Sequence, residues 1–482
     1  MTNRIIKNIT TVKVKNLQKV PLYSPWNMKK IGDIECIDER HVDAILKVSD
    51  DFFNNTKHQI NKTDRLEILK KSKSLLSKRS FEFAKFISLE GGKPLKDSKI
   101  EVERAINGIE LAIECIKKSY GKEIPMNLNA SSKNKMAFTK QFPIGPVLAI
   151  SAFNHPLNLI IHQVIPAVAA GCPIIIKPSL DTPLTCYEFI KLLINAGLPN
   201  GFCQMVNTNN NNITKKFVSD NRISFFSFIG SSEVGWKLKS ILSPGTKCAL
   251  EHGGIAPVII DKNYNFKKII PSIIKGSFYH AGQVCVSIQK VIVHEDIIDD
   301  FISNMKKHVK KIIVGDPNKI NTDVGPLIRK NALIRVDSIV QKAIKNGAKL
   351  ICGGKFFNNT CYECTILKDP NEKDEINNIE IFGPVICIYS YKTINDAIKK
   401  ANHKKYAFQS SVYTSDIDTA MLCYEKLEAK SIFINEQTAF RVDWMPFGGI
   451  KHSGEGVGGI EYTYFDLLYD KLMVISSDKI TK

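Results

Sequence analysis

Apolar and polar positions along the chain predict strands and helices that follow one another in turn. Between residues 147 and 229, short apolar runs of strand length alternate with longer stretches of helical period. The predicted strands are Val147–Ser151, Pro173–Lys177, Gln204–Asn207 and Ser224–Ile229, and the predicted helices are Leu157–Ala170 and Leu184–Ala196. Such alternation is typical of parallel βαβ units with helices on both faces of the sheet. Before this unit, leucines near helical spacing predict a helix over Asp64–Leu89, with Thr63 as its N-cap.

The alternation restarts after Gly253 and predicts a second α/β unit. Its predicted strands are Pro257–Ile260, Val291–His294, Leu350–Cys352, Val385–Tyr389 and Ser431–Asn435, and its first helices are Phe266–Tyr279 and Ile297–Lys311. Glu123–Gln141 and Tyr464–Ser477 fit neither sheet, but both alternate enough to form antiparallel strands. We expect these two segments to form a protruding piece where subunits could pair.

Composition indicates a folded protein, and the charge leaves a basic nucleic-acid-binding protein or a non-catalytic one as the alternative to an enzyme. Of 482 residues, 44% are hydrophobic and 9% aromatic, which excludes disorder as the main state. The 67 basic against 48 acidic residues give a formal charge of +19, as in proteins that bind nucleic acids. However, the clusters Lys70–Arg79 and Lys306–Lys311 lie at helical spacing and lack interleaved aromatic residues, so they indicate solvated helix faces. We expect no nucleic-acid partner.

The apolar stretches are too short or too broken by Pro and Gly to span a membrane. The basic start, residues 1–12, has no apolar core leading to a cleavage site. We therefore expect a cytoplasmic protein without a membrane partner. In that reducing compartment the twelve cysteines would remain thiols, so a single reactive one could matter.

Three segments together predict a nucleophilic site. Cys285 stands in FYHAGQVCV just after a predicted helix; by itself such a cysteine is more often an inert core residue. Asn154 in SAFNHP follows the end of a predicted strand, where open α/β sheets place ligands and catalytic groups. Glu251 in LEHGG stands beside two glycines that allow close approach of the backbone. The three supply a thiol, an amide donor for an oxyanion and a carboxylate base.

Six motifs in one order carry a resemblance to a known family. They are Lys177–Ser179, Phe228–Gly235, Leu250–Gly254, Gly282–Cys285, Glu380–Pro384 and Pro446–Gly449. This series resembles the NAD(P)-dependent aldehyde dehydrogenase superfamily. The resemblance implies two Rossmann-type α/β domains and a small antiparallel oligomerisation piece, and hence a homodimer or a dimer of dimers. It divides the chain into a cofactor-binding domain (1–122 and 144–252), a catalytic domain (253–455) and bridging segments (123–143 and 456–482).

The resemblance also implies the roles of the three candidate residues. Cys285 would attack the aldehyde carbonyl, and the Asn154 amide and the Cys285 backbone N–H would hold the oxyanion. Glu251 would activate the water that hydrolyses the resulting thioester, giving the free acid. Members that transfer the acyl group to coenzyme A commonly lack this glutamate, so its presence favours hydrolysis, with acyl transfer as the alternative.

Cofactor contacts follow from the same resemblance. Gly230 and Ser231 would meet the pyrophosphate at a helix N-terminus, and Lys177 the adenosine ribose. On the nicotinamide side, Glu380 would bind the ribose and Phe382 would pack beside the ring. Many NAD-preferring members have a glutamate three residues after the lysine, where this chain has Leu180 followed by Asp181. Ser179 could donate to a 2′-phosphate, and the choice between NAD and NADP stays open.

The stretch before Pro446 bears on the substrate. Arg441 could hold an anionic group of the aldehyde through its planar fork, or it could pair with Asp443. Phe153 and Trp444 could line an apolar tunnel. Members that act on phosphorylated aldehydes often have arginine directly before the nucleophile, where this chain has Val284. We expect a small hydroxy- or acid-bearing aldehyde, such as lactaldehyde, a semialdehyde or a sulfonated aldehyde.

Two further features need an interpretation. His252 replaces the leucine that is commoner in the family, and it either tunes Glu251 or is a hydrogen-bonded packing residue, the commoner case. Cys361 and Cys364 form a CxxC with Cys352 nearby, but no second pair follows at the spacing of a zinc finger. We expect buried thiols there and no metal.

Overall fold

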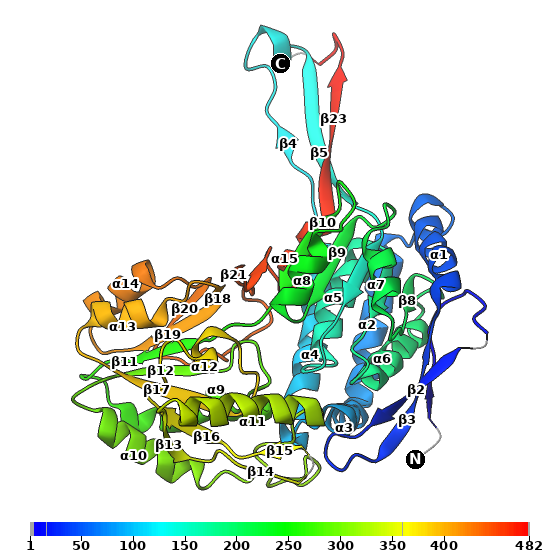
Figure 1. Ribbon diagram of the computed structural model, residues 1–482. Helices are drawn as coiled ribbons and strands as arrows, with labels where there is room; N and C mark the ends of the chain where they lie inside the picture. Colours follow the sequence, from blue (N-terminus) through cyan, green and yellow to red (C-terminus); the bar gives the residue numbers. More distant parts are fainter. Residues whose placement is uncertain (1–3, 16, 359, 481–482) are drawn as a thin grey trace.

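The computed structural model describes residues 4–15, 17–358 and 360–480, and it has two α/β lobes with a narrow sheet projecting from one of them (Figure 1). The first lobe contains a six-stranded sheet and the second a seven-stranded sheet. The N-terminal strands β1 (Ile5–Ile6), β2 (Gln18–Tyr23) and β3 (Lys30–Cys36) form a small separate sheet beside the first lobe. The α/β fold class that the alternation predicts is confirmed.

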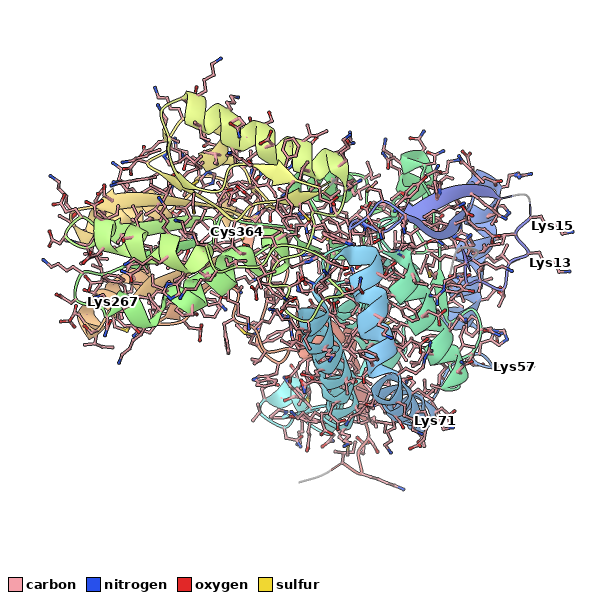
Figure 2. All side chains as sticks on the ribbon, turned by 90° about the horizontal axis from the view of Figure 1, so that it is seen from below. Lys13, Lys15, Lys57, Lys71, Lys267 and Cys364 are labelled. Carbon is pink, nitrogen blue, oxygen red and sulfur yellow. The ribbon has the colours of Figure 1, made fainter. Side chains whose placement is uncertain are left out.

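Lysines lie around the outside of both lobes. Figure 2 shows Lys13, Lys15, Lys57 and Lys71 along the outer side of the first lobe and Lys267 at the outer end of the second lobe, whereas Cys364 lies inside the second lobe. Acidic neighbours pair with much of the first basic cluster: Lys70 with Glu67, Lys73 with Glu110, and Arg79 with Glu82 and Glu188. In the second cluster, Lys306, Lys307, Lys310 and Lys311 are exposed on the outer side of a helix whose other side is buried. Both clusters therefore have the character of solvated helix faces.

The first sheet is parallel except for one short edge strand. Its order is β22–β10–β9–β6–β7–β8, and β22 is the antiparallel member. The bounds are β6 (Val147–Ile150), β7 (Ile174–Lys177), β8 (Cys203–Met205), β9 (Phe225–Ile229), β10 (Lys247–Glu251) and β22 (Gly454–Glu455). The connecting helices are α5 (Asn158–Ala170), α6 (Pro183–Asn195), α7 (Asn211–Val218) and α8 (Ser232–Lys239).

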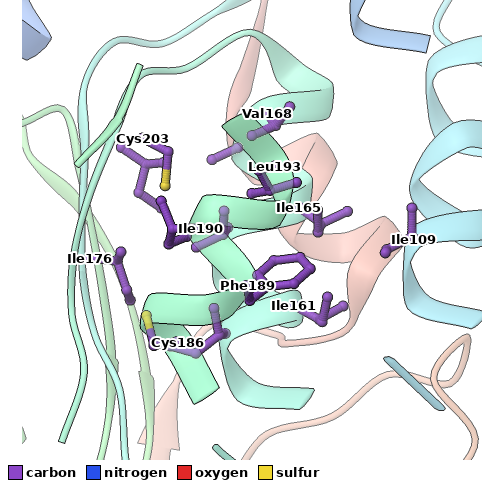
Figure 3. Packing of buried hydrophobic residues seen from close by; sticks show 14 of the residues in the cluster. Ile109, Ile161, Ile165, Val168, Ile176, Cys186, Phe189, Ile190, Leu193 and Cys203 are labelled. Atoms are coloured by element: carbon purple, nitrogen blue, oxygen red, sulfur yellow. The ribbon is translucent and has the colours of Figure 1, made fainter. Parts of the chain in front are cut away.

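Strand alternation places a hydrophobic core on each face of this sheet. Val147 and Ala149 of β6 face a cluster with α4, α5 and α6, whereas Leu148 and Ile150 face one with α1, α7 and α8. Figure 3 shows α5 and α6 packed together on the first face, with Phe189 of α6 among the buried residues. Burying one such large side chain stabilises the fold by about 1.5–3 kcal/mol. Because helices cover both faces of this sheet, its strands are continuous apolar runs.

The N-terminal helices differ in two details from the prediction over Asp64–Leu89. The stretch is two helices, α2 (Lys62–Lys78) and α3 (Ser80–Gly91), because Arg79 leaves the helical conformation at φ −102° and ψ 13°. The N-cap is Asn61, not Thr63, since the Asn61 side chain accepts from the Asp64 N–H at 2.9 Å. The other helices of this region are η1 (Glu39–His41), α1 (Val42–Asn54) and α4 (Leu95–Lys117).

The second sheet has the order β13–β16–β17–β12–β11–β19–β20, and β13 is its antiparallel strand. The strands are β11 (Pro257–Ile260), β12 (Lys290–His294), β13 (Lys349–Cys352), β16 (Thr365–Lys368), β17 (Val385–Tyr391), β19 (Gln409–Tyr413) and β20 (Ser431–Ile434). The helices are α9 (Ile270–Phe278), α10 (Ile298–Val309), α11 (Lys330–Lys345), α12 (Glu375–Asn378), α13 (Ile394–Ala401) and α14 (Ile417–Lys426). The helix predicted over Phe266–Tyr279 begins as the 3₁₀ turn η3 (Phe266–Lys268), and α9 starts with Pro271 in its first turn.

Short pairs of strands complete this lobe: β14 (Phe356–Phe357) pairs with β15 (Cys361–Tyr362), and β18 (Tyr406–Ala407) pairs with β21 (Ile450–Lys451).

The projecting sheet consists of β4 (Glu123–Ile124), β5 (Lys135–Pro143) and β23 (Leu468–Ser476), with the turn η2 (Ala130–Ser132) near its tip. β23 pairs antiparallel with β5 from Leu468 opposite Pro143 to Ser476 opposite Lys135. The strand is shorter than the predicted Tyr464–Ser477, because Tyr464 belongs to α15 (Ile460–Asp466), which packs on α4 and α5. The division of the chain into three domains remains a prediction.

Candidate active site

One edge of the first sheet gathers four of the predicted site residues. β6, β7, β9 and β10 are parallel, so their carboxyl ends meet at the same edge. Asn154 lies in the loop after β6, Lys177 ends β7, Gly230 follows β9 and Glu251 ends β10. The sheet topology therefore brings together residues that are up to 97 positions apart in the sequence (251 minus 154).

Asn154 connects this edge to the segment that carries Cys285. Its side chain is 5% exposed, and its Nδ2 donates to the Gln283 carbonyl oxygen at 2.9 Å. An amide NH₂ has two hydrogens, so one remains for a second acceptor. Asn154 can therefore hold the cysteine segment and still donate to an oxyanion beside Cys285.

The turn before Cys285 has an unusual backbone. His280, Ala281 and Gly282 have φ values of 48°, 55° and 68°, in the left-handed region. Only glycine adopts this conformation freely, and the two other residues cost about 1 kcal/mol or more each. A Cβ at Gly282 would overlap the Gly383 carbonyl oxygen, so position 282 needs glycine for space as well.

Gln283 secures this turn. Its side-chain Nε2 donates to the His280 carbonyl at 3.2 Å and to the Pro326 carbonyl at 3.4 Å. Its Oε1 accepts from the Ile328 N–H at 2.9 Å. These buried bonds offset the strain and fix the backbone immediately before the nucleophile.

Cys285 lies against an apolar wall formed by Val284, Val286, Phe408 and Phe447. Burial raises the pKa of its thiol well above the usual range, and the nearby charges of Glu380 and Glu251 raise it further. The resting residue is therefore a thiol, and it must lose its proton to a base when it reacts.

Each of the two carboxylates near the thiol lies against a glycine. A Cβ at Gly458 would overlap the Glu251 carboxylate, and a Cβ at Gly253 would overlap that of Glu380. Burial raises the pKa of Glu251 to about 7, which the positive charges of Arg441 and Lys430 partly oppose. Burial raises the pKa of Glu380 to about 8, and its Oε1 is buried without a hydrogen-bond partner. Both groups can change protonation near neutral pH.

Arg441 is not closely paired with Asp443. Asp443 accepts two bonds from Arg104, at 3.0 and 2.8 Å, and one contact from His162 at 2.8 Å. The Arg441 Nε is 3.9 Å from Asp443, and its Nη1 is buried with no partner. The guanidinium carbon lies 3.8 Å from the centre of the Phe447 ring. Arg441 therefore has free donors beside the wall of the Cys285 site.

A family comparison decides what kind of site this is. The sequence model of the Aldehyde dehydrogenase family matches residues 12–472. The chain belongs to the aldehyde dehydrogenase family. It is therefore an oxidoreductase that acts on aldehydes with NAD or NADP.

Curated relatives cover almost the whole aldehyde dehydrogenase chain. The 3-sulfolactaldehyde dehydrogenase of Priestia aryabhattai is 33% identical over 95% of both chains. The lactaldehyde dehydrogenase of Methanococcus aeolicus is 35% identical, over 96% of this chain and 98% of that one.

Two solved structures are similar over nearly their full length. Aldehyde dehydrogenase 21 from Physcomitrella patens, in complex with the reaction product succinate, is 30% identical with a TM-score of 0.93 and covers 99% of both chains. The glyceraldehyde-3-phosphate dehydrogenase of Methanocaldococcus jannaschii, complexed with NADP, is 32% identical with a TM-score of 0.91. That match covers 96% of this chain and all of the other.

The structure also locates the other residues expected at the dehydrogenase site. Phe153 and Phe382 meet edge to face with ring centres 5.7 Å apart, and Phe382 has a left-handed backbone at φ 50°. Ser231 is the N-cap residue of α8, directly after Gly230. Trp444 lies on the surface with its side chain 58% exposed, so it is not enclosed with Cys285.

Sequence reasoning missed the residues that support the site from a distance. Arg104 bonds to Asp443, which leaves the Arg441 guanidinium without a close acidic partner. Gln283 stabilises the turn before Cys285 through its side-chain hydrogen bonds. Gln283 stands in the GQVC motif, so its neighbourhood was visible in the sequence. Arg104 lies in the middle of an ordinary amphipathic helix, and no local signal distinguishes it.

The cysteines give no sign of a second centre. Cys361 and Cys364 are buried free thiols, and Cys352 is partly buried. Among residues 4–15, 17–358 and 360–480, no group of three or more His, Cys, Asp or Glu could hold a metal ion. Within the same ranges, no helix is long and apolar enough to cross a membrane.

Proposed function

We propose that this aldehyde dehydrogenase is a hydrolytic enzyme that oxidises a small hydroxy- or acid-bearing aldehyde through Cys285. The observation that carries the proposal is the bond from the buried Asn154 amide to the carbonyl of Gln283, two residues before the thiol. It aligns an oxyanion donor with the nucleophile, while Glu251 is close enough for its charge to affect the thiol pKa. A thiol, a donor and a base thus converge on one point.

The reaction follows from these groups. The Cys285 thiol passes its proton to solvent water, its sulfur bonds to the aldehyde carbon as the carbonyl π bond opens, and the Asn154 amide and the Cys285 N–H stabilise the resulting oxyanion. A bound NAD or NADP would supply the acceptor for the hydride that leaves this carbon, so the substrate would be oxidised and a thioester would remain on Cys285. Glu251 then removes a proton from water, which attacks the thioester and releases the acid and the Cys285 thiol. Glu251 suits this role because its pKa of about 7 lies near the working pH.

Water is favoured over coenzyme A as the acyl acceptor. Glu251 ends β10 with its carboxylate held against Gly458 and unpaired by any close cation, so it is available to a water molecule. Acyl transfer to coenzyme A would need no such base, because a thiolate attacks a thioester directly. Free acid as the product supports hydrolysis, and an acyl-CoA formed on addition of coenzyme A would support the alternative.

Arg441 supports an anionic or hydroxyl-bearing substrate. Its buried, unpartnered Nη1 is a donor for an oxygen of a carboxylate or sulfonate; burial and the nearby charge of Arg104 lower the pKa of Arg441 to about 10, which still leaves it charged at neutral pH. The relatives named for 3-sulfolactaldehyde and lactaldehyde, and the complex with succinate, point to the same class of small oxygen-rich compounds. Phe153 would form part of the apolar surface opposite; its ring meets that of Phe382.

The residues present fit a dinucleotide cofactor. Lys177 ends β7, Gly230 and the N-cap residue Ser231 directly precede α8, and the unpartnered Glu380 Oε1 is available to a ribose hydroxyl. Acceptance of NADP as well as NAD is supported at the adenosine end. Arg329 lies 3.2 Å from the Asp181 carboxylate and partly offsets its charge, whereas Ser179 Oγ donates to the same carboxylate at 3.4 Å and would have to turn away from it to bind a 2′-phosphate.

The projecting sheet supports self-association into a homodimer or a dimer of dimers. β23 forms one edge of this sheet, and Tyr469, Leu472, Met473, Val474 and Ile475 are exposed along it. An exposed apolar edge strand is a ready site for pairing with another chain.

A panel of aldehydes assayed with NAD and with NADP tests the proposal. Lactaldehyde, 3-sulfolactaldehyde and succinic semialdehyde should reduce the cofactor with higher kcat/KM than unsubstituted alkanals of similar length. Cys285→Ala should abolish turnover while cofactor still binds, as measured by calorimetry. Turnover that survives in this variant would rule out the thioester route.

A further inference from the structure

His252 follows Glu251 and is held in one orientation by its surroundings. It is 2% exposed and packs between Phe228 and Trp236, with ring centres 5.7 and 5.8 Å away. A Cβ at Gly235 would overlap its ring, so α8 approaches the imidazole as closely as glycine allows. An imidazole fixed so tightly can act as a precise anchor for a neighbouring group.

The group that His252 anchors is the backbone of Gly230. The His252 Nδ1 lies 3.1 Å from the Gly230 carbonyl oxygen. Because a carbonyl oxygen only accepts, the hydrogen must be on Nδ1, and Nε2 is left buried without a partner. The Gly230 N–H donates to the Glu251 carbonyl at 3.1 Å. Both backbone groups of Gly230 are thus bonded to the adjacent residues Glu251 and His252.

The start of α8 is held from a second direction as well. Ser232 Oγ and Trp236 Nε1 both donate to the His452 carbonyl, at 2.9 and 3.3 Å. The loop after His452 leads into β22, which pairs with β10 at Glu251 opposite Gly454. These bonds fix the position of α8, whereas the His252 ring and the Glu251 carbonyl bond to the turn that precedes it.

We propose that His252 is a positioning residue that aims the Gly230–Ser231 turn at the cofactor pyrophosphate and keeps this turn in register with Glu251. This inference rests on the proposed function, in which that turn meets the pyrophosphate. Leucine, the commoner residue of the family here, can fill the same space but cannot bond the Gly230 carbonyl. In this chain a polar contact therefore sets the direction of the amides that follow Gly230.

Matched variants in a Cys285→Ala background test the role by calorimetric titration with NADP and with NAD. His252→Leu should weaken binding about fivefold to tenfold, as expected for the loss of one buried hydrogen bond. His252→Asn places its amide nitrogen near the position of Nδ1 and should bind within about twofold of the parent. His252→Gln places its nitrogen near Nε2 and should behave like the leucine variant. With Cys285 intact, the KM for cofactor should rise in His252→Leu while the KM for aldehyde stays the same.

Two outcomes would overturn the inference: unchanged affinity in His252→Leu, or equal weakening in the asparagine and glutamine variants. If the leucine variant does not fold, as judged by thermal unfolding, the asparagine and glutamine pair still decides. Lys177→Ala separates this result from the proposed function, because Lys177 lies on another strand. Unchanged cofactor affinity in Lys177→Ala would contradict the proposed cofactor site itself, whatever the His252 variants do.

Discussion

Replacing Arg441 by methionine tests whether its guanidinium recognises an anionic group on the substrate. Methionine keeps the apolar contact with Phe447 and removes the donors. The fold should tolerate the change, because Asp443 keeps its two bonds from Arg104 and its contact with His162. Arg441→Met therefore removes the charge from the substrate site without leaving Asp443 as a buried, unpaired carboxylate.

The magnitude follows from the burial of Arg441. A hydrogen bond to a charged group is worth about 1.5–3 kcal/mol, and the upper half of that range applies when water is excluded. The Arg441 side chain is 10% exposed, so we expect a loss of about 2–3 kcal/mol with a sulfonated aldehyde. This corresponds to a fall in kcat/KM of about 30-fold to 150-fold. Arg441→Lys keeps a point charge but loses the planar fork, so its loss should be intermediate.

The assay compares two aldehydes that differ in one group. Initial rates of cofactor reduction would be measured with 3-sulfolactaldehyde and with lactaldehyde, which has the same carbon chain but no sulfonate. Arg441→Met should lower kcat/KM for lactaldehyde by no more than about threefold, since lactaldehyde has no anionic group for the guanidinium to bind. Equal losses for both aldehydes would refute the reasoning, because a structural defect does not distinguish the two substrates.

Three further predictions concern the base, the cofactor and the subunit contact. With both substrates saturating, kcat should rise with pH through about 7 and then level off, because Glu251 acts when deprotonated and its pKa is raised to about 7. Glu251→Gln should keep the first burst of reduced cofactor but lose this pH limb and most steady turnover, as stopped-flow absorbance would record; an unchanged steady rate would exclude Glu251 as the base. Leu180→Glu should lower kcat/KM for NADP by about tenfold or more and leave kcat/KM for NAD nearly unchanged, because the new carboxylate repels a 2′-phosphate. Equal effects on both cofactors would place Leu180 away from the phosphate. Val474→Lys, on the exposed β23, should lower the mass measured by light scattering to that of a monomer, and an unaltered oligomer would show that β23 is not the contact.

Buried strands are the part of the fold that could be predicted from the sequence. β6, β7 and β9 are covered on both faces, so each is a continuous apolar run that is visible in the sequence. The break at Arg79 could not be predicted, because no proline or glycine marks it and its cause is the packing of α3 against α4 and α6. The N-cap of α2 was wrong by two residues, since Asn61 and Thr63 are both capable caps and tertiary context selects between them.

Candidate site residues could be named from the sequence, but the contacts between them could not. Cys285, Asn154 and Glu251 stand in short motifs, so each was a candidate on local grounds. The bond that aligns two of these motifs joins Asn154 to Gln283 across 129 positions, and no local pattern encodes it. Likewise, the two interpretations of Arg441 could not be separated, because the answer depends on Arg104, which is 339 positions from Asp443.

Both lobes contribute bonds to the strained turn before Cys285, where we propose the oxyanion site. His280 and Ala281 hold left-handed conformations that a free chain rarely adopts. They persist because Gln283 bonds to Pro326 and Ile328 within the second lobe, while Asn154 bonds from the first lobe to the Gln283 carbonyl. These contacts all join groups of the protein itself, so no substrate atom is needed to hold the proposed donors in place. Folding contacts therefore offset the free energy of backbone strain. The proposed reaction would not have to supply it when charge develops on an oxyanion.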